Sequence, residues 1–333
     1  MDTTETLGAV AHPGGMLVRR PELTVGVVRA VSRLSALEIE LLARHPLDRR
    51  SATERQQDIR QLPSRPAVAP RRLLPEYDEG IDLRVGLLDP AGRVRWEFAT
   101  SSMSSSGDYY LGTSGPTYRS VFRFPPSFDQ MSLVLAWPEI GFPETVIPLP
   151  LPDRTTVERA TTSIWQAPLD VRPVPDGLTH RAGDHHASPA LEAGTNVAPP
   201  RVLLRHDHRA AVVLTRLIEA NSMLSMELRG FAKHDSADAI NPHAFHGRRR
   251  TSAEMDDPAQ IRAHRGPSVA VVQGHEAIWI PPGDGSFSGG DQTFSSLQEF
   301  TLNRPHGDLL DLIVAWPLAG LDDVRVHIPL TPA

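Results

Sequence analysis

The chain has 333 residues, 22% of them charged, with a formal net charge of −6 and no cysteine. Its length suits two domains of roughly 130–150 residues, each large enough to bury a core. The weakly acidic charge excludes the basic footprint of a nucleic-acid-binding or polybasic membrane-surface protein, and the lack of cysteine excludes a disulfide framework, a thiolate metal site and a Cys nucleophile.

The first residues predict neither a leader nor a folded element. Residues 1–22 contain Pro13 and Gly14-Gly15 and show little hydrophobic periodicity, so we expect a loose N-terminal arm. The start of the chain lacks the basic residues and the apolar run of a signal peptide. No apolar stretch approaches the roughly 20 residues that span a bilayer. We therefore expect a cytoplasmic protein with no membrane partner.

Residues 23–165 have the pattern of an antiparallel sheet. Apolar and polar residues alternate over Leu37–Leu41, which is typical of a strand with one face in the core and the other exposed to solvent. Asp89–Gly92 predicts a hairpin turn, whereas the Ser/Gly-rich stretch Ser101–Gly115 predicts a mobile loop. Thr155–Trp165 predicts one short helix at the end of this half. The expected strands are residues 24–31, 37–42, 81–88, 93–98, 118–124, 132–137 and 144–149.

The second half of the chain repeats the first. A hydrophobic run ends in Leu135-Ala136-Trp137-Pro138 in one half and in Val314-Ala315-Trp316-Pro317 in the other. Further residues match in the same order along the two halves, and the halves differ in length only between these blocks of matching residues. They pair Arg29, Ser35, Leu37, Glu40, Leu41 and Gly141 with Arg216, Ser222, Leu224, Glu227, Leu228 and Gly320. This duplication predicts two domains of one fold.

Each half offers about seven short strands with turn signals between them, which indicates a β-sandwich. The predicted fold is therefore all-β: a tandem duplication of an immunoglobulin-like antiparallel β-sandwich with few short helices. We expect the first sandwich over 23–165 and the second over 201–333. Residues 166–200 are rich in Pro, Gly and His and predict an interdomain linker.

One segment carries a resemblance to known sequences. Trp137–Thr145 reads Trp-Pro-Glu-Ile-Gly-Phe-Pro-Glu-Thr and follows a Pro-rich strand. It resembles a group of uncharacterised actinobacterial proteins with the pattern Trp-Pro-x-x-Gly-x-Pro-Glu-Thr. The second half matches only at Trp316-Pro317 and Gly320, and has Asp322-Asp323 in place of Pro143-Glu144. The resemblance implies a bacterial, cytoplasmic origin and transfers no catalytic residue.

The strongest metal candidate is the pair His243 and His246. Two His three residues apart can share a helical face and bind a metal, with His234 and Asp235 as further ligands. The alternative is a polar surface loop, because Pro242 and Gly247 bracket the pair and disfavour a helix.

Other polar clusters have a simpler interpretation as solvated surface. These are the acidic group Glu76, Asp78 and Glu79, the run Arg248-Arg249-Arg250, and the His-rich segments His185-His186 and His206-Asp207-His208. The hydroxyl-rich segments Ser101–Gly115 and Gly283–Ser296 lack the spacing of a phosphate loop or a nucleophile elbow, and both are expected to be mobile loops. Trp137 and Trp316 are expected in the core, each at the end of an apolar strand, with an exposed aromatic platform as the alternative.

The residues repeated between the halves are mostly framework types, namely apolar residues, Pro and Gly, whereas the polar candidates for a functional site are not repeated. This pattern predicts a non-enzymatic binding or assembly protein that recruits a protein partner or forms a homo-oligomer, without a cofactor. The alternative is a metal-dependent hydrolase with a site between the halves near His243 and His246.

Overall fold

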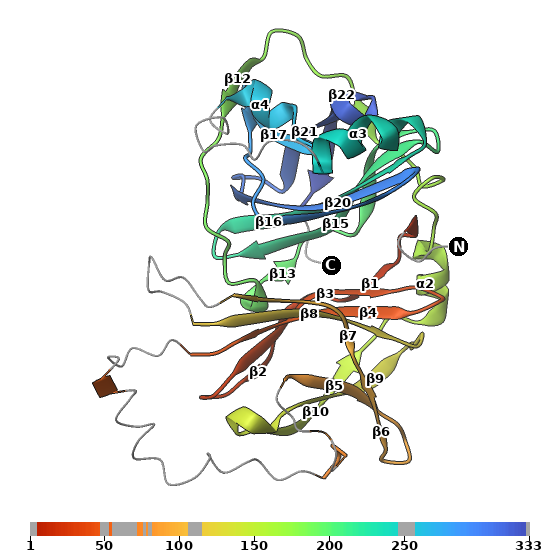
Figure 1. The fold of residues 1–333 in the computed structure, drawn as a ribbon, viewed down its shortest axis with the longest axis vertical. Helices are drawn as coiled ribbons and strands as arrows, with labels where there is room; N and C mark the ends of the chain where they lie inside the picture. The colour runs from red at the N-terminus through yellow and green to blue at the C-terminus, as the bar shows by residue number, and fades with distance from the viewer. Residues whose placement is uncertain are drawn as a thin grey trace. The chain divides into compact units, whose positions relative to one another are not determined.

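The computed structural model describes residues 5–46, 53–54, 72–75, 78, 82–105, 115–245 and 257–330. The chain divides into two compact units, and each is built mainly of β-strands (Figure 1). The N-terminal unit is Val10–Glu158, and the C-terminal unit is Met1–Ala9 together with Arg159–Ala333. None of the described helices is both long and apolar enough to cross a membrane.

The N-terminal unit has two antiparallel sheets. One has the order β1-β3-β4-β8-β7, with β2 also paired to β3, and the other has the order β10-β9-β5-β6. The strands of the first sheet are β1 (Ala9–His12), β2 (Gly15–Arg19), β3 (Thr24–Ser32), β4 (Leu37–Arg44), β7 (Ala99–Ser105) and β8 (Thr117–Phe124). Those of the second are β5 (Arg84–Leu88), β6 (Val94–Glu97), β9 (Gln130–Trp137) and β10 (Phe142–Pro150).

The C-terminal unit repeats this arrangement. Its sheets have the orders β13-β15-β16-β20-β19, with β14 also paired to β15, and β11-β22-β21-β17-β18-β12. The first contains β13 (Thr195–Asn196), β14 (Arg201–His206), β15 (Ala210–Ala220), β16 (Met223–Lys233), β19 (Gly285–Gly290) and β20 (Thr293–Asn303). The second contains β11 (Val171–Arg172), β12 (Thr179–Ala182), β17 (Ser268–Gln273), β18 (Glu276–Trp279), β21 (Leu309–Trp316) and β22 (Leu321–Pro329).

The strand order of both units is that of an immunoglobulin sandwich. In chain order, β3 to β10 of the N-terminal unit take the positions A, B, C, C′, D, E, F and G. The strands β15 to β22 of the C-terminal unit take the same positions in the same order. They pair as A-B-E-D in one sheet and G-F-C-C′ in the other, which are the two sheets of that fold. The fold prediction is confirmed, because the chain is a tandem of two immunoglobulin-like sandwiches with few helices: α2 (Arg154–Ala160), α3 (Asp235–Phe245), α4 (Pro258–Arg262) and short 3-10 turns.

Two segments expected to be irregular contain strands that extend these sheets. Residues 1–22 were expected to be a loose arm, yet β1 and β2 both pair with β3. In the segment 166–200, expected to be a linker, β11, β12 and β13 pair with β22, β18 and β15. The expectation failed because backbone pairing with an existing strand orders a short segment that has no amphipathic pattern of its own.

The repeated tryptophans occupy equivalent core positions. Trp137 is 4% exposed and Trp316 is fully buried, each at the C-terminal end of strand F. The indole N–H of Trp316 donates to the carbonyl of Arg265 at 2.8 Å. The repeated Gly141 and Gly320 follow at φ 80° and 74°, a left-handed conformation that glycine adopts without strain. The core prediction for both tryptophans is confirmed.

A buried ion pair is also repeated. Arg29 lies opposite Glu40 on β3 and β4, and Arg216 lies opposite Glu227 on β15 and β16, each just after a β-bulge in the A strand. The Nε of Arg29 is 3.2 Å from a Glu40 oxygen, and an NH group of Arg216 is 3.3 Å from a Glu227 oxygen. The matching blocks in the sequence therefore mark a shared electrostatic element of the A-B hairpin.

Candidate functional site

Most sheet edges in the two sandwiches are covered or blocked. Short strands pair with strand A in both units, β1 and β2 on β3, and β13 and β14 on β15. In the C-terminal unit, β11 covers the edge at strand G and β12 covers the edge at strand C′. In the N-terminal unit, strand G contains Pro143, Pro148 and Pro150, and strand C′ has only four residues, including Arg95 and Glu97. Proline, charge and short length all discourage pairing with a further strand.

The D strands are different. In the part of the chain that the structure describes, no strand pairs with the outer side of β7 or of β19. Their sequences are Ala-Thr-Ser-Ser-Met-Ser-Ser and Gly-Ser-Phe-Ser-Gly-Gly, which contain no charge and no proline. Residues 99–104 are exposed, and so is all of β19 except the half-buried Phe287. Both sandwiches therefore leave the same edge available for strand addition.

The register shows which backbone groups of β19 point away from the sheet. The N–H of Gly283 donates to the carbonyl of Glu299 at 2.8 Å, and the N–H of Glu299 donates to the carbonyl of Asp284 at 3.0 Å. Inward and outward residues alternate in an antiparallel ladder. From that starting point, Ser286 and Ser288 bond to β20, whereas Phe287 and Gly289 direct their N–H and C=O groups to the open edge. The register of β7 on β8 places Ser104 in the position equivalent to Phe287.

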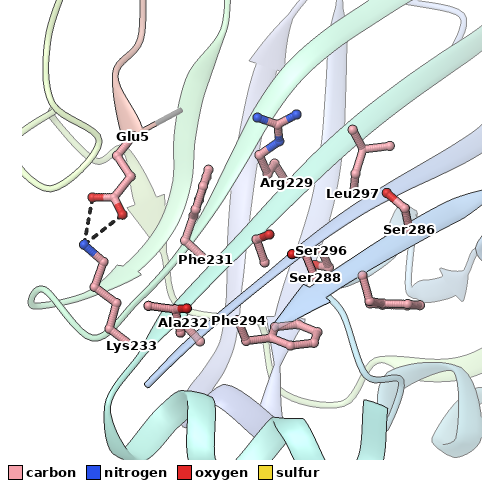
Figure 2. Close-up of a pocket in the computed structure, with 13 residues that line it drawn as sticks. Glu5, Arg229, Phe231, Ala232, Lys233, Ser286, Ser288, Phe294, Ser296 and Leu297 are labelled. Carbon is pink, nitrogen blue, oxygen red and sulfur yellow. Dashed lines mark hydrogen bonds and ion pairs between the residues drawn. The ribbon is translucent and has the colours of Figure 1, made fainter. Parts of the chain in front are cut away.

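A pocket of about 590 Å³ lies over β16, β20 and β19, next to the β19 edge (Figure 2). Alternate residues of a strand share a face, so Arg229, Phe231 and Lys233 line up along β16. The register places Leu297 and Ser286 beside Arg229, and Ser295 and Ser288 beside Phe231. Thr293 lies beside Lys233. The pocket therefore combines two cations, the aromatic rings of Phe231, Phe287 and Phe294, and a group of hydroxyls.

The cation at one end of the pocket is neutralised. The Nζ of Lys233 lies 2.8 Å from both carboxylate oxygens of Glu5, as the dashed lines in Figure 2 show. The indole N–H of Trp165 donates to Glu5 at 2.7 Å, and Lys233 lies 5.0 Å from the centre of that ring. The backbone of Thr6 and Ser163 pairs alongside. We interpret this triad as a structural tie between residues 5–7, residues 162–165 and β16.

The other cation, Arg229, is half-buried and uncompensated. Within the described residues, its guanidinium makes no hydrogen bond and no ion pair. Among the described residues that line the pocket, Glu5 is the only acidic one, and it already binds Lys233 and Trp165. Arg229 is thus the group in this pocket that is free to bind an incoming anion.

A second cavity, of about 380 Å³, lies within the N-terminal unit. Its walls include Trp137, Tyr118 and Phe122, and Phe98 at its lining is 83% exposed. Tyr118 meets Trp137 edge to face at 4.9 Å. The ion pair of Arg84 with Asp78, at 2.9 Å, contributes a polar border. Asp82, Arg84 and Glu97 also line this cavity, so it combines aromatic rings with charged groups.

Of the predicted metal pair, the structure describes His243 alone. His243 is exposed in the last turn of α3, and His246 lies outside the described residues, so the pair stays a prediction. The expectation that Pro242 prevents a helix was wrong, because α3 contains Pro242 and buries Ala237 and Ile240 in the core. Within the described ranges, no group of three or more His, Cys, Asp or Glu side chains is arranged to hold a metal ion.

The hydroxyl-rich segments were only partly understood from sequence. Gly283–Ser296 forms the hairpin of β19 and β20, and Ser101–Ser105 belongs to β7, so the mobile-loop interpretation is wrong for these residues. Residues 106–114 lie outside the described structure. Ser and Gly have low strand propensity, and pairing with the E strand overrides it. The missed residue Arg229 could have been found by aligning the halves, since Leu42 stands at its position in the first half.

The comparisons with known proteins add little. No family model and no curated protein matches the chain. Among solved structures, the conserved domain protein from Bacillus anthracis is 9% identical, with 92% of this chain and 77% of that chain covered and a TM-score of 0.20. Bovine butyrophilin is 9% identical, with 97% and 98% covered and a TM-score of 0.20. At this level of similarity neither protein informs function, and the fold assignment rests on the strand order.

Proposed function

We propose that this protein is a non-enzymatic binding or assembly module that recruits an extended segment of a protein partner by strand addition at its D-strand edges. The observation that carries this proposal is the pair of bare edges, β7 and β19, at equivalent positions in two sandwiches whose other edges are covered or blocked. An open edge is an aggregation hazard unless it is used, so its retention in both copies favours a binding role.

The chemistry of the edge suits strand addition. Phe287 and Gly289 offer main-chain donors and acceptors, which provide affinity independent of the partner's sequence. The small Ser and Gly side chains of β19 leave room for the side chains of an incoming strand. Self-association is a different outcome, in which a second copy supplies the added strand.

Proline at an outward-facing position tests the proposal. Gly289→Pro removes one outward N–H without removing a bond to β20, and Gly289→Ala is the matched control that keeps this N–H. Wild-type protein and both variants serve as baits in a pull-down from the native cell, with circular dichroism to verify the fold. We expect the partner to be retained by wild type and Gly289→Ala and lost with Gly289→Pro.

The same pair of substitutions at Ser104 tests the first copy. Sedimentation velocity on the purified protein separates the two kinds of association, because a dimer that disappears in Gly289→Pro identifies a second copy as the occupant. If a partner binds the folded proline variants as tightly as it binds wild type, the edges are not the binding surface.

The hydrolase alternative near His243 and His246 stays a prediction. Stoichiometric zinc or manganese in the purified protein would favour it.

A further inference from the structure

Comparison of the two sandwiches singles out Arg229. In the N-terminal unit, the corresponding cross-strand pair is Leu42 on β4 opposite Arg119 on β8. In the C-terminal unit, the pair is reversed, with Arg229 on β16 opposite Leu297 on β20. Glu40 is buried and forms ion pairs with both Arg29 and Arg119, whereas the corresponding carboxylate, Glu227, pairs with Arg216 and not with Arg229. Because the arginine lies on strand B and not on strand E in this unit, Arg229 has no carboxylate partner among the described residues.

An uncompensated, half-buried guanidinium has a physical consequence. Removing an ion from water costs free energy that is recovered only when a counter-charge or hydrogen-bond acceptor is supplied. Lys233 cannot share its own counter-charge, because both oxygens of Glu5 already lie 2.8 Å from its Nζ. An anion entering the pocket would therefore meet Arg229 as its principal electrostatic partner.

The other lining residues and the volume of the pocket are compatible with a small ligand that carries hydroxyl groups. Ser286 presents a hydroxyl beside Arg229, and Ser288 presents one beside Phe231, which supplies an apolar wall (Figure 2). Ser295, on β20, adds a third hydroxyl to the lining. Hydroxyls both donate and accept hydrogen bonds, so they complement the hydroxyls of a sugar. The volume of about 590 Å³ lies within the range of small-molecule sites, roughly 300–1,000 Å³.

We propose that this pocket binds a small hydroxylated organic anion, of the acidic-sugar class, whose oxyanion pairs with Arg229 and whose hydroxyls bond to the serines of β19 and β20. The anionic group can be a carboxylate, as in a uronic acid, or a phosphate, as in a sugar phosphate. Arginine binds both through two parallel N–H···O bonds. This site is separate from strand addition, because it uses the face of the sheet and not the outward backbone groups of β19.

Calorimetric titration with glucuronate, glucose 6-phosphate and glucose tests the site on the full chain. We expect one of the two anions to bind and glucose to bind at least tenfold more weakly, which also identifies the anionic group as carboxylate or phosphate. Glucose binding as tightly as both anions, or no binding of either anion, would overturn the proposal.

Substitution of Arg229 tests the assignment. Arg229→Leu installs the residue found at this position in the first copy, and should weaken binding of the anion about 10- to 100-fold, the equivalent of one hydrogen-bonded charge. Arg229→Lys retains the charge and should lose less than Arg229→Leu. Arg201→Leu, on β14 and outside the pocket, is the matched control and should bind as wild type.

Unchanged binding in a folded Arg229→Leu protein would place the anion elsewhere and refute the site. Should Arg229→Leu fail to fold, Arg229→Lys and Ser288→Ala provide the same comparison, and full affinity in both would refute it as well. Gly289→Pro should leave anion binding intact, so the failure of strand addition and the failure of this site can be distinguished.

Discussion

The carboxylate of Glu144 accepts the backbone N–H of Leu73, with its two oxygens 2.8 and 2.9 Å from the nitrogen. It also accepts the N–H of Arg72 at 2.9 Å and that of Leu74 at 2.7 Å. One side chain at the start of strand G thus holds three consecutive N–H groups of the segment between strands B and C. In the second sandwich, Asp323 has the related role of binding Arg262 of α4, at 2.9 Å.

We expect Glu144→Ala to lower the free energy of unfolding by about 1–3 kcal/mol, because three N–H donors lose a charged acceptor. Urea denaturation followed by tryptophan fluorescence measures this loss. Glu139→Ala, at an exposed position in the neighbouring 3-10 turn, is the control and should change stability by less than about 0.5 kcal/mol. Equal stabilities of the two variants would contradict a structural role for Glu144.

Trp316→Ala should lower the free energy of unfolding by about 3–5 kcal/mol, the usual loss for a large buried aromatic residue. Trp137→Ala should lose a similar amount, since its ring is 4% exposed and packs edge to face on Tyr118. Thermal unfolding measures both. An unchanged melting temperature for Trp316→Ala would be incompatible with the packing described above.

Glu227→Ala should destabilise the C-terminal sandwich by about 1–3 kcal/mol, because the buried Arg216 loses one carboxylate partner and keeps the other, Glu299, at 2.7 Å. Arg216 and Glu227 are each 1% exposed, so water cannot replace the lost partner. Arg216→Leu should cost more than Glu227→Ala, because it removes the arginine that binds two buried carboxylates, Glu227 and Glu299. An Arg216→Leu protein at least as stable as Glu227→Ala would contradict this account.

Stability should fall as the pH drops below neutrality. Burial lowers the pKa of His45 and of His12 below the ordinary value of 6.5, and the Nδ1 of His12 accepts the N–H of Gly14 at 3.1 Å, which requires a neutral ring. In this window the unfolded chain binds more protons than the folded chain, so the stabilisation is complete above pH 6.5 and is lost as the pH falls below it.

Denaturation at pH 7.5 and pH 5.5 measures this dependence. His45→Phe, which keeps an aromatic ring beside Tyr118 and Trp137, should show a smaller loss between the two pH values than wild type. His243→Phe, at an exposed position, is the control. An identical pH dependence in His45→Phe and wild type would show that His45 does not contribute to it.

Local pattern was sufficient to predict the sandwiches. The alternation of apolar and polar residues over Leu37–Leu41 predicts a strand with one face in the core, independently of the rest of the chain. The repeated Trp-Pro pairs indicated two copies of one architecture. The buried positions of Trp137 and Trp316 followed from the apolar runs that precede them. Periodicity and repetition are properties of neighbouring residues, so the sequence alone carries them.

The candidate binding features depended on tertiary structure. Ser286 and Gly289 have weak strand propensity, and only pairing with β20 makes them an edge. Likewise, Arg229 is chemically like any other arginine in the sequence. It became a candidate only when strand register placed it beside Leu297 and gave the neighbouring carboxylates other partners. Long-range pairing decides which backbone groups and charges remain unsatisfied, because it joins residues far apart in the chain.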